Sequence, residues 1–481
     1  MKVKSFIFAV FGMSTLLSAQ NNSVNSGSSQ ATLLNVQGFR IEVKTPDLPV
    51  DSLFIFVYSY SKKQFRPVYG IKYASEAVFT DTNYLVPGLY LLNADSNNVL
   101  EFLISDNKHQ RFSINIKSNA VVFDGSDENT ANLQYTLSVR EYDQQTKALD
   151  TIFQQIEQSN ESFAEKQTRI DSIVLQYRAI TRRKLDYQAK VVKENKGSLL
   201  ASIILATMEV PPPPTMKDYT DRTRYFKYLA EYCFYKYDFS DDRILATPLA
   251  NNKFRTFNEI ISELDDKDAI PYVLDALRKS QVSPQHYYDF FDYLEQDFGL
   301  SKSPFRKETL YIAMLHYAID STYIDPYRKE RYLYELNIIN KNHPGEKIPN
   351  FPLIMGNGDT TDLYAIEAEH LLLYLQSIDC QACTKTREKM KEIEALNKAI
   401  ADKKITVLTI YSEDDKNLWQ NYIENNANPN WIHGWNYDAA IEDKHLIDAR
   451  STPCMYLLDK NKTILKKNMK IYELEMLNLW F

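Results

Sequence analysis

The chain is poor in glycine and cysteine and has no excess of positive charge. Its 481 residues include 12 glycines, 4 cysteines, 56 lysines and arginines, and 63 aspartates and glutamates, so the net charge is −7. Glycine makes up about 7% of average proteins, and none of these few forms a dinucleotide-binding or P-loop motif. Without a basic block the chain is a poor candidate for binding nucleic acid. The apolar content of 44% and the charged content of 25% are typical of a globular protein, and the length indicates several domains.

The N-terminus has the pattern of a secretory signal peptide. Lys2 and Lys4 precede the apolar run Phe6–Leu17, and small residues follow it, which predicts cleavage after residue 19. The run is shorter than the roughly 20 apolar residues of a membrane span. An N-terminal core helix is the alternative, but residues 20–30 form an Asn/Ser-rich linker with little to pack. We therefore expect an exported protein without a membrane span, periplasmic or associated with the cell envelope if the source is a diderm bacterium.

Two different periodicities follow the linker. Residues 31–128 contain apolar residues in alternation, as at Phe39, Ile41 and Val43, and six or seven short strands are expected to form a β-sandwich. Residues 129–342 instead show apolar and aromatic residues at helical spacing, which predicts a helical domain with a tyrosine-rich interior. The sequence thus predicts a multidomain protein in which a β-sandwich precedes a helical middle region.

The last region, residues 343–481, begins at a His-Pro-Gly breaker and reads as an α/β domain. Buried strands alternate with helices there, which indicates a sheet with parallel strands. The expected elements are a hairpin at Pro352–Leu363, strands Leu371–Leu375, Ile405–Tyr411, Cys454–Leu458 and Thr463–Leu465, and helices at Gln381–Ala401, around Trp419 and from Tyr472. Within the first of these helices the charged stretch Lys385–Glu394 is expected to face solvent.

One constellation carries chemistry: Cys380-Gln-Ala-Cys383, placed between the first buried strand and the helix that follows it. A thiol at a helix N-terminus is exposed to the positive end of the helix dipole, which lowers its pKa and favours the thiolate. The second cysteine lies one turn into the helix, so the pair can alternate between dithiol and disulfide. A static disulfide is the alternative. A zinc site is disfavoured because neither a second CxxC nor a His pair completes four ligands.

A second feature lies about 70 residues after the CxxC, where Thr452-Pro453 opens the strand that begins at Cys454. At this point the sequence resembles the thioredoxin-like superfamily, and in particular exported bacterial thiol:disulfide oxidoreductases with an N-terminal β-domain and a helical segment. The resemblance covers about 140 C-terminal residues. It includes Trp419, Trp431, the run Gly434–Asp438 and the run Thr452–Ile464, with a weaker match over the first 130 residues.

The resemblance implies a role for each residue of the site. Cys380 would attack a disulfide and Cys383 would resolve the mixed disulfide. Pro453 would be a cis-proline facing the dithiol, and the backbone of Thr452 would pair with a bound substrate strand. No bound cofactor is implied. The expected partners are disulfide-containing envelope proteins and a membrane or soluble thiol electron donor.

Three positions depart from the family pattern or remain open. The usual tryptophan before the first cysteine is absent, and Asp379 in the flank would oppose thiolate formation. The buried acid expected six residues before the nucleophile is Tyr374. Cys454 follows the cis-proline position, and it is either a buried strand cysteine or a third redox thiol.

Two functional hypotheses follow. In the first, the protein is an exported enzyme that reduces or isomerises disulfides of cell-envelope proteins through Cys380 and Cys383. In the second, it is a non-catalytic binding or scaffold protein that retains a thioredoxin-like fold. The redox behaviour of the two cysteines discriminates between them.

Overall fold

A computed structural model describes the chain from residue 38 to residue 479, except 47–50, 74–75, 96–97, 118–119, 212, 214, 216–219, 301–302 and 322–323. The predicted signal peptide and linker therefore lie outside the described residues. Two compact units can be separated: the described part of Met1–Leu264 with Asp275–Phe291, and Asp265–Leu274 with Asp292–Phe481. Each unit is described by itself.

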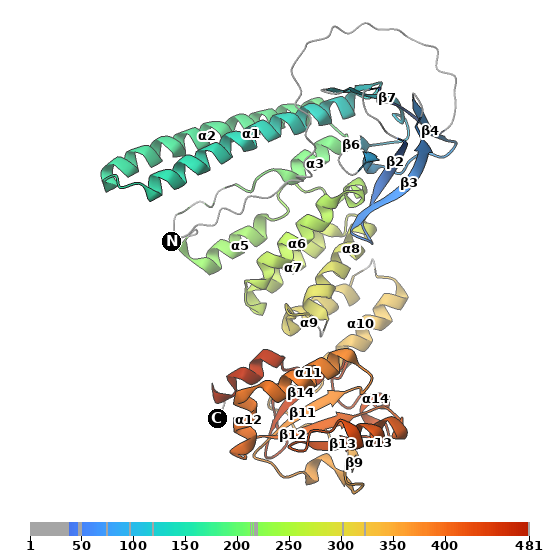
Figure 1. Cartoon of the computed structure of the whole chain (residues 1–481), viewed down its shortest axis with the longest axis vertical. Coiled ribbons are helices and arrows are strands. Elements are labelled where there is room, and N and C mark those ends of the chain that lie inside the picture. The colour runs from blue at the N-terminus through green and yellow to red at the C-terminus, as the bar shows by residue number, and fades with distance from the viewer. Residues whose placement is uncertain are drawn as a thin grey trace. The chain divides into compact units, whose positions relative to one another are not determined.

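The first unit begins with the predicted β-sandwich (Figure 1). One sheet has the order β4-β1-β7-β8 and the other β3-β2-β5-β6. All pairings are antiparallel except that of β1 with β7. The strands are β1 (Phe39–Lys44), β2 (Ser52–Ser59), β3 (Gln64–Lys72), β4 (Ala77–Asp81), β5 (Gly88–Asp95), β6 (Asn98–Ile104), β7 (Arg111–Lys117) and β8 (Ala120–Asp124).

Strand alternation positions the core of the sandwich. Phe39, Ile41 and Val43 of β1 are fully buried, while their neighbours along the strand are partly or fully exposed. They pack in one cluster with residues of the other sheet, including Leu53 and Phe102. Burying such side chains contributes about 1.5–3 kcal/mol each. The alternation read from the sequence is thus the inner face of a two-sheet sandwich.

The described residues hold eight strands in this region, against the six or seven expected. The sequence analysis did not identify β3, β4 or β6. In β3 no residue is fully buried, and Pro67 and Gly70 interrupt the apolar pattern. An edge strand of this kind lacks the alternation on which sequence-based recognition depends.

Helices follow from Asp127, as the change of periodicity predicts. The helices of this region are α1 (Asp127–Gln158), α2 (Phe163–Glu194), α3 (Leu199–Thr207), α5 (Arg222–Tyr232), η1 (Asp242–Ala246), α6 (Pro248–Ser262), α7 (Asp266–Ser280), α8 (Pro284–Leu294), the π-helix η2 (Glu295–Gly299), α9 (Glu308–Ile319) and α10 (Pro326–Ile339). Side chains cap several of them: Ser126 caps α1, and Ser162 with Glu165 forms a capping box on α2.

The long helices α1 and α2 lie side by side as an antiparallel hairpin (Figure 1). Leu149 and Ile156 of α1 pack there against Ile173 and Ile180 of α2. The helices that follow in the first unit enclose an aromatic core around Phe254, which is fully buried and contacts Phe234, Tyr237 and Phe290. The expected aromatic interior is present, with phenylalanine as prominent as tyrosine.

The second unit contains the C-terminal α/β domain. Its seven-stranded sheet has the order β10-β9-β13-β12-β11-β14-β15, in which β11, β12 and β13 run parallel and the remaining pairings are antiparallel. Its elements are β9 (Pro352–Met355), β10 (Thr360–Asp362), η3 (Leu363–Ala365), β11 (His370–Gln376), α11 (Gln381–Glu392), α12 (Glu394–Ala401), β12 (Thr406–Tyr411), α13 (Lys416–Asn425), β13 (Ile432–Trp435), α14 (Ala440–Asp443), β14 (Cys454–Asp459), β15 (Ile464–Lys467) and the 3-10 helix η4 (Ile471–Leu479).

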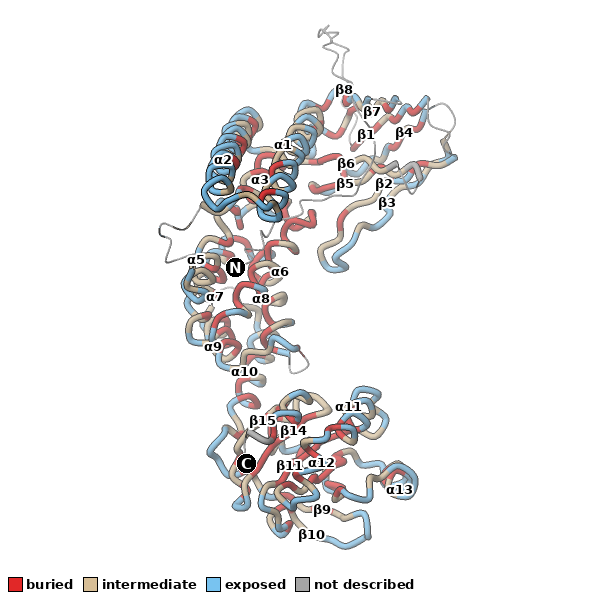
Figure 2. The backbone as a smooth tube through the Cα atoms, turned by 60° about the vertical axis from the view of Figure 1, so that its left-hand side comes forward, coloured by how far each residue is buried: buried red, intermediate tan, exposed pale blue. Residues whose placement is uncertain are grey.

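Both faces of this sheet are covered, and the central strands are buried throughout (Figure 2). One face packs against Met390 of α11 and Leu396 of α12. The other packs against residues such as Ile441 and Phe351. This double burial explains why β11 and β12 appear in the sequence as unbroken apolar runs.

One local prediction for this domain was wrong, and one strand was missed. The helix expected over Gln381–Ala401 is two helices, because Ile393 leaves the helical conformation with ψ near 108°. Strand β13 was not predicted: it is only four residues long and contains His433 and Gly434. The final helix is a 3-10 helix.

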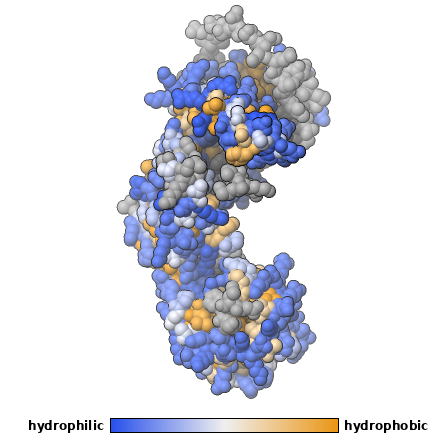
Figure 3. All heavy atoms as spheres, turned by 90° about the vertical axis from the view of Figure 1, so that its left-hand side faces the viewer, coloured by the Kyte–Doolittle hydropathy of each residue, from blue (hydrophilic) through white to orange (hydrophobic). Residues whose placement is uncertain are grey.

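On the face shown in Figure 3, hydrophilic residues predominate and hydrophobic ones are scattered. Single exposed apolar residues are ordinary for a folded protein. Within the described part of the chain, no helix combines the length and the apolar character that a membrane span requires.

Candidate active site: the Cys380–Cys383 dithiol

The first cysteine lies at the junction between β11 and α11. Cys380 is the N-cap of α11, and its sulfur accepts a hydrogen bond from the backbone N–H of Cys383 at 3.2 Å. The sulfur therefore occupies the place that a Ser or Asp oxygen takes at most helix N-termini. Free N–H groups and the helix dipole favour a negative charge there.

The environment of Cys380 favours its thiolate. Partial burial raises the pKa, but hydrogen bonds from the thiol of Cys383, from the backbone N–H groups of Cys383 and Ala382 and from the side chain of Thr452 outweigh it. The net pKa of Cys380 lies below its ordinary value. Asp379, expected to oppose the thiolate, is exposed to solvent, where water screens its charge.

Cys383 has the opposite character. It is fully buried, and burial, followed by the hydrogen bond to Cys380, raises its pKa to about 11. The two thiols are free in this structure. The pair thus combines one partly exposed, acidic thiol with one buried, protonated thiol, which is the asymmetry that thiol–disulfide exchange uses.

Thr452 and Pro453 form the second part of the expected site. The Thr452–Pro453 peptide bond is cis, as the resemblance implied. The side chain of Thr452 lowers the pKa of both cysteine thiols. The structure therefore brings four of the five site residues together, although they are some 70 positions apart in the sequence.

Cys454 is separated from this group by the sheet. Successive residues of a strand point to opposite faces. Cys454 packs with Tyr456 in the cluster on one face, whereas Met455 packs with Tyr374 and with Met390 of α11 on the other. Burial raises the pKa of Cys454 to about 12, and its thiol lies 3.6 Å from the carbonyl oxygen of Asp448. The geometry favours the buried strand cysteine over the third redox thiol.

Tyr374 occupies the position where the resemblance places a buried acid. It is fully buried, and its hydroxyl donates a 2.7 Å hydrogen bond to the backbone carbonyl of Cys383. Burial raises the pKa of Tyr374, so this hydroxyl stays protonated. Tyr374 therefore fixes the first turn of α11 but offers no base to Cys383.

Arg387 is a feature that the sequence analysis assigned wrongly. It lies in the charged stretch expected to face solvent, yet its exposed fraction is only 5%. Its guanidinium donates to the side-chain oxygen of Gln376 at 2.7 Å and lies 5.1 Å from the ring centre of Tyr422. Its helix face could be derived, because Arg387 follows Cys383 by four residues, but the partners that allow an arginine to be buried there could not.

Comparison with known proteins finds family models that match two regions of the chain. A model described as thioredoxin-like matches residues 369–464, which include the dithiol and the cis-proline loop. The C-terminal domain is thioredoxin-like. Residues 180–342 match a domain of unknown function, DUF5106. None of the curated proteins matches the chain.

Several solved structures resemble parts of this chain. A thioredoxin-like protein from Bacteroides caccae is 25% identical, with a TM-score of 0.51, and the match covers 57% of this chain and 98% of that one. The C-terminal domain of an uncharacterized protein from Bacteroides fragilis is 34% identical over 28% of this chain and 96% of its own, with a TM-score of 0.27. The thioredoxin domain of a thiol-disulfide oxidoreductase from Bacteroides vulgatus is 19% identical over 29% and 97%, with a TM-score of 0.25.

Proposed function

We propose that the protein is a thiol:disulfide oxidoreductase that uses Cys380 as nucleophile and Cys383 as resolving thiol. The observation that carries the proposal is the asymmetry of the pair: Cys380 caps α11 with a lowered pKa, and Cys383 is buried with a raised one. Thr452, whose side chain lowers the pKa of both thiols, and the adjacent cis-Pro453 are the proposed site for the substrate strand.

The reaction follows from this arrangement. The Cys380 thiolate attacks a substrate disulfide, forms a mixed disulfide and releases one substrate thiolate. Cys383 then attacks the Cys380 sulfur, its proton passes to the released thiolate, and the second substrate thiolate leaves. Two electrons have moved to the substrate, and Cys380 and Cys383 end as a disulfide. A membrane or soluble thiol donor is required to reduce that disulfide for the next cycle.

The proposed location is the cell envelope. The proposal rests on the charged and apolar pattern of residues 1–19, which predicts export. Disulfide-bonded substrates are found in such oxidising compartments. Fractionation of the source cells, with N-terminal sequencing of the mature chain, tests it. A full-length N-terminus in the cytoplasmic fraction would contradict it.

The function is tested by redox titration. The chain from Gln20 is equilibrated in glutathione or dithiothreitol buffers and quenched with an alkylating agent, and the labelled cysteines are identified by mass spectrometry. An active pair shows a reversible two-electron transition between about −120 and −270 mV. A transition below about −300 mV, or a pair that never closes, contradicts the proposal and favours a scaffold protein. The Cys380→Ser variant is the control, and it must lose the transition.

A further inference from the structure

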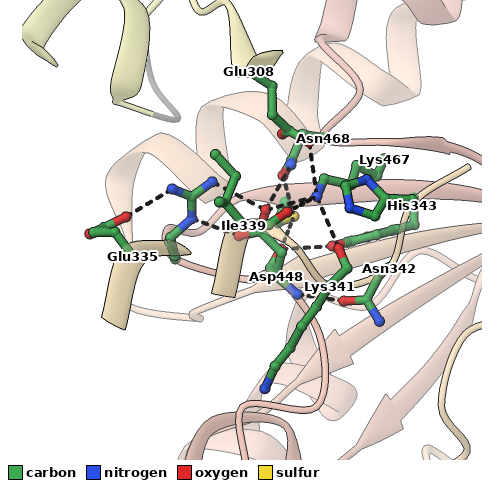
Figure 4. A network of polar contacts seen from close by, with 12 residues as sticks. Glu308, Glu335, Ile339, Lys341, Asn342, His343, Asp448, Lys467 and Asn468 are labelled. Atoms are coloured by element: carbon green, nitrogen blue, oxygen red, sulfur yellow. Dashed lines mark hydrogen bonds and ion pairs between the residues drawn. The ribbon is translucent and has the colours of Figure 1, made fainter. Parts of the chain in front are cut away.

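A cluster of buried charges lies beside the cis-proline loop, within the second unit. Its centre is Asp448, whose exposed fraction is 1%. Three cations surround this carboxylate: Arg450 at 2.7 Å, Lys467 at 3.3 Å and Arg306 at 3.7 Å. Figure 4 shows Asp448 and Lys467 pointing toward each other at the centre of the network. These cations hold the pKa of the Asp448 carboxyl below its ordinary value in spite of burial.

The cluster is completed by carboxylates from two helices of the middle region. Glu335 of α10 accepts a 2.9 Å hydrogen bond from Arg450. Glu308, the first residue of α9, pairs with Lys467 at 3.0 Å and with Arg306 at 2.6 Å. Each cation of the cluster is thus paired with a carboxylate on a helix. The charges of three cations and three carboxylates balance.

A balanced buried network of this kind is weak evidence for stability, because desolvation offsets most of the attraction. The network does provide hydrogen bonds of defined geometry. Arg450 holds both oxygens of Asp448, at 2.7 and 3.2 Å, while its remaining nitrogen reaches Glu335. A planar guanidinium held at both ends has little freedom to move.

Arg450 lies in the same short segment as Thr452 of the candidate site. Asp448 and Arg450 belong to the segment between α14 and β14, and Thr452 is two residues beyond Arg450. The backbone of Asp448 is fixed as well: its N–H donates to the side chain of Asn342 at 2.8 Å, and its carbonyl accepts from the hydroxyl of Tyr456 at 2.8 Å. The loop that contains Thr452 is therefore held by Glu335 of α10 and by Asn342, which follows α10.

We propose that Arg450 is a positioning residue, clamped between Asp448 and Glu335, that holds Thr452 against the dithiol, so that α10 forms part of the working site. This inference rests on the proposed function, in which Cys380 and Cys383 are the reactive thiols. Arg450 acts through Thr452 and not on the sulfurs. Since the Thr452 side chain lowers the pKa of both cysteines, a displaced loop removes this stabilisation of the Cys380 thiolate.

The test is the pH dependence of alkylation of Cys380 in the reduced full-length chain, with iodoacetamide as the probe. Glu335→Gln removes one charge at a partly exposed position of α10 and keeps the side-chain shape. The expected result is an upward shift of the alkylation midpoint by about half a unit to one unit, as for the loss of one hydrogen bond to a thiolate. Glu330→Gln, on the exposed side of the same helix, is the matched control and leaves the midpoint unchanged.

A double-mutant cycle separates positioning from mere stability. Thr452→Val raises the midpoint by removing the donor, and Glu335→Gln added to it causes no further rise if both act through Thr452. Additive shifts, or no shift in Glu335→Gln, refute the proposal. Arg450→Gln is the second variant, and near-ultraviolet circular dichroism shows that each chain is folded. Because alkylation needs no disulfide substrate, a chain without oxidoreductase activity refutes the proposed function and still leaves this test decisive for the positioning role.

Discussion

The asymmetry of the two thiols can be measured directly in the reduced protein. The pKa of Cys380 lies below the ordinary value of 9.0 and that of Cys383 is raised to about 11. At pH 7.5 the thiolate fraction is then above about 3% for Cys380 and about 0.03% for Cys383. Lower basicity reduces the intrinsic nucleophilicity of Cys380 by roughly tenfold over two pKa units. Cys380 should therefore react with iodoacetamide at least about tenfold faster than Cys383.

The perturbation that tests the cause is Cys383→Ala. It removes the thiol donor to Cys380 and leaves the backbone N–H donors in place. A hydrogen bond to a charged group contributes about 1.5–3 kcal/mol, or roughly one to two pKa units, and partial exposure of Cys380 reduces this to about one. We expect the alkylation midpoint of Cys380 to rise by about one pH unit.

The assay is the rate of Cys380 alkylation against pH, read as labelled peptide by mass spectrometry. Cys454→Ala is the control, because Cys454 packs on the opposite face of the sheet and should leave the midpoint unchanged. An unchanged midpoint in Cys383→Ala would show that the cysteine pair does not set the acidity of Cys380. An equal shift in Cys454→Ala would show that the assignment of the two sheet faces is wrong.

Three further outcomes are expected. Tyr374→Phe removes the hydrogen bond to the Cys383 carbonyl and should lower the free energy of unfolding by about 1 kcal/mol, seen as faster amide exchange in the first turn of α11; unchanged exchange would contradict it. Phe254→Ala should cost about 3–5 kcal/mol in the aromatic core of the first unit, measured by thermal unfolding, whereas a loss below about 1 kcal/mol would contradict the packing. Burial lowers the pKa of His286 despite Asp242, so the unfolded chain takes up a proton first and stability should fall as pH drops below about 6.5; His286→Gln should flatten that dependence in denaturant titrations.

The site could be recognised in the sequence because its chemistry depends on local order. A CxxC between a buried strand and a helix N-terminus needs no long-range information, and Thr452-Pro453 at the start of a later apolar strand gave the second landmark. The face of Cys454 could also be derived, since alternation along β14 separates Cys454 from Met455. The sequence analysis left Cys454 open between a buried strand cysteine and a third redox thiol, because proximity along a strand does not mean a shared face.

Other features could not be predicted because tertiary contacts decide them. Arg387 is buried because Gln376 and Tyr422 provide neutral partners from two other elements. Strand β13 exists because β12 and β9 supply its hydrogen bonds, although His433 and Gly434 give it no strand pattern of its own. In each case the residue type is unfavourable for its place, and packing overrides the local preference.

The charge network around Asp448 can be compared with the domain boundary predicted at residue 343. The His-Pro-Gly breaker at residue 343 marks a turn of the chain, and the sequence predicts a domain boundary there. Yet Glu308 and Glu335 lie before it, and their partners Lys467 and Arg450 lie after it. A chain starting at residue 343 would leave both of these cations without a helix carboxylate, with Asp448 as their remaining partner in the network. The charge network beside the cis-proline loop therefore reaches back to α9 and includes residues on both sides of the predicted boundary.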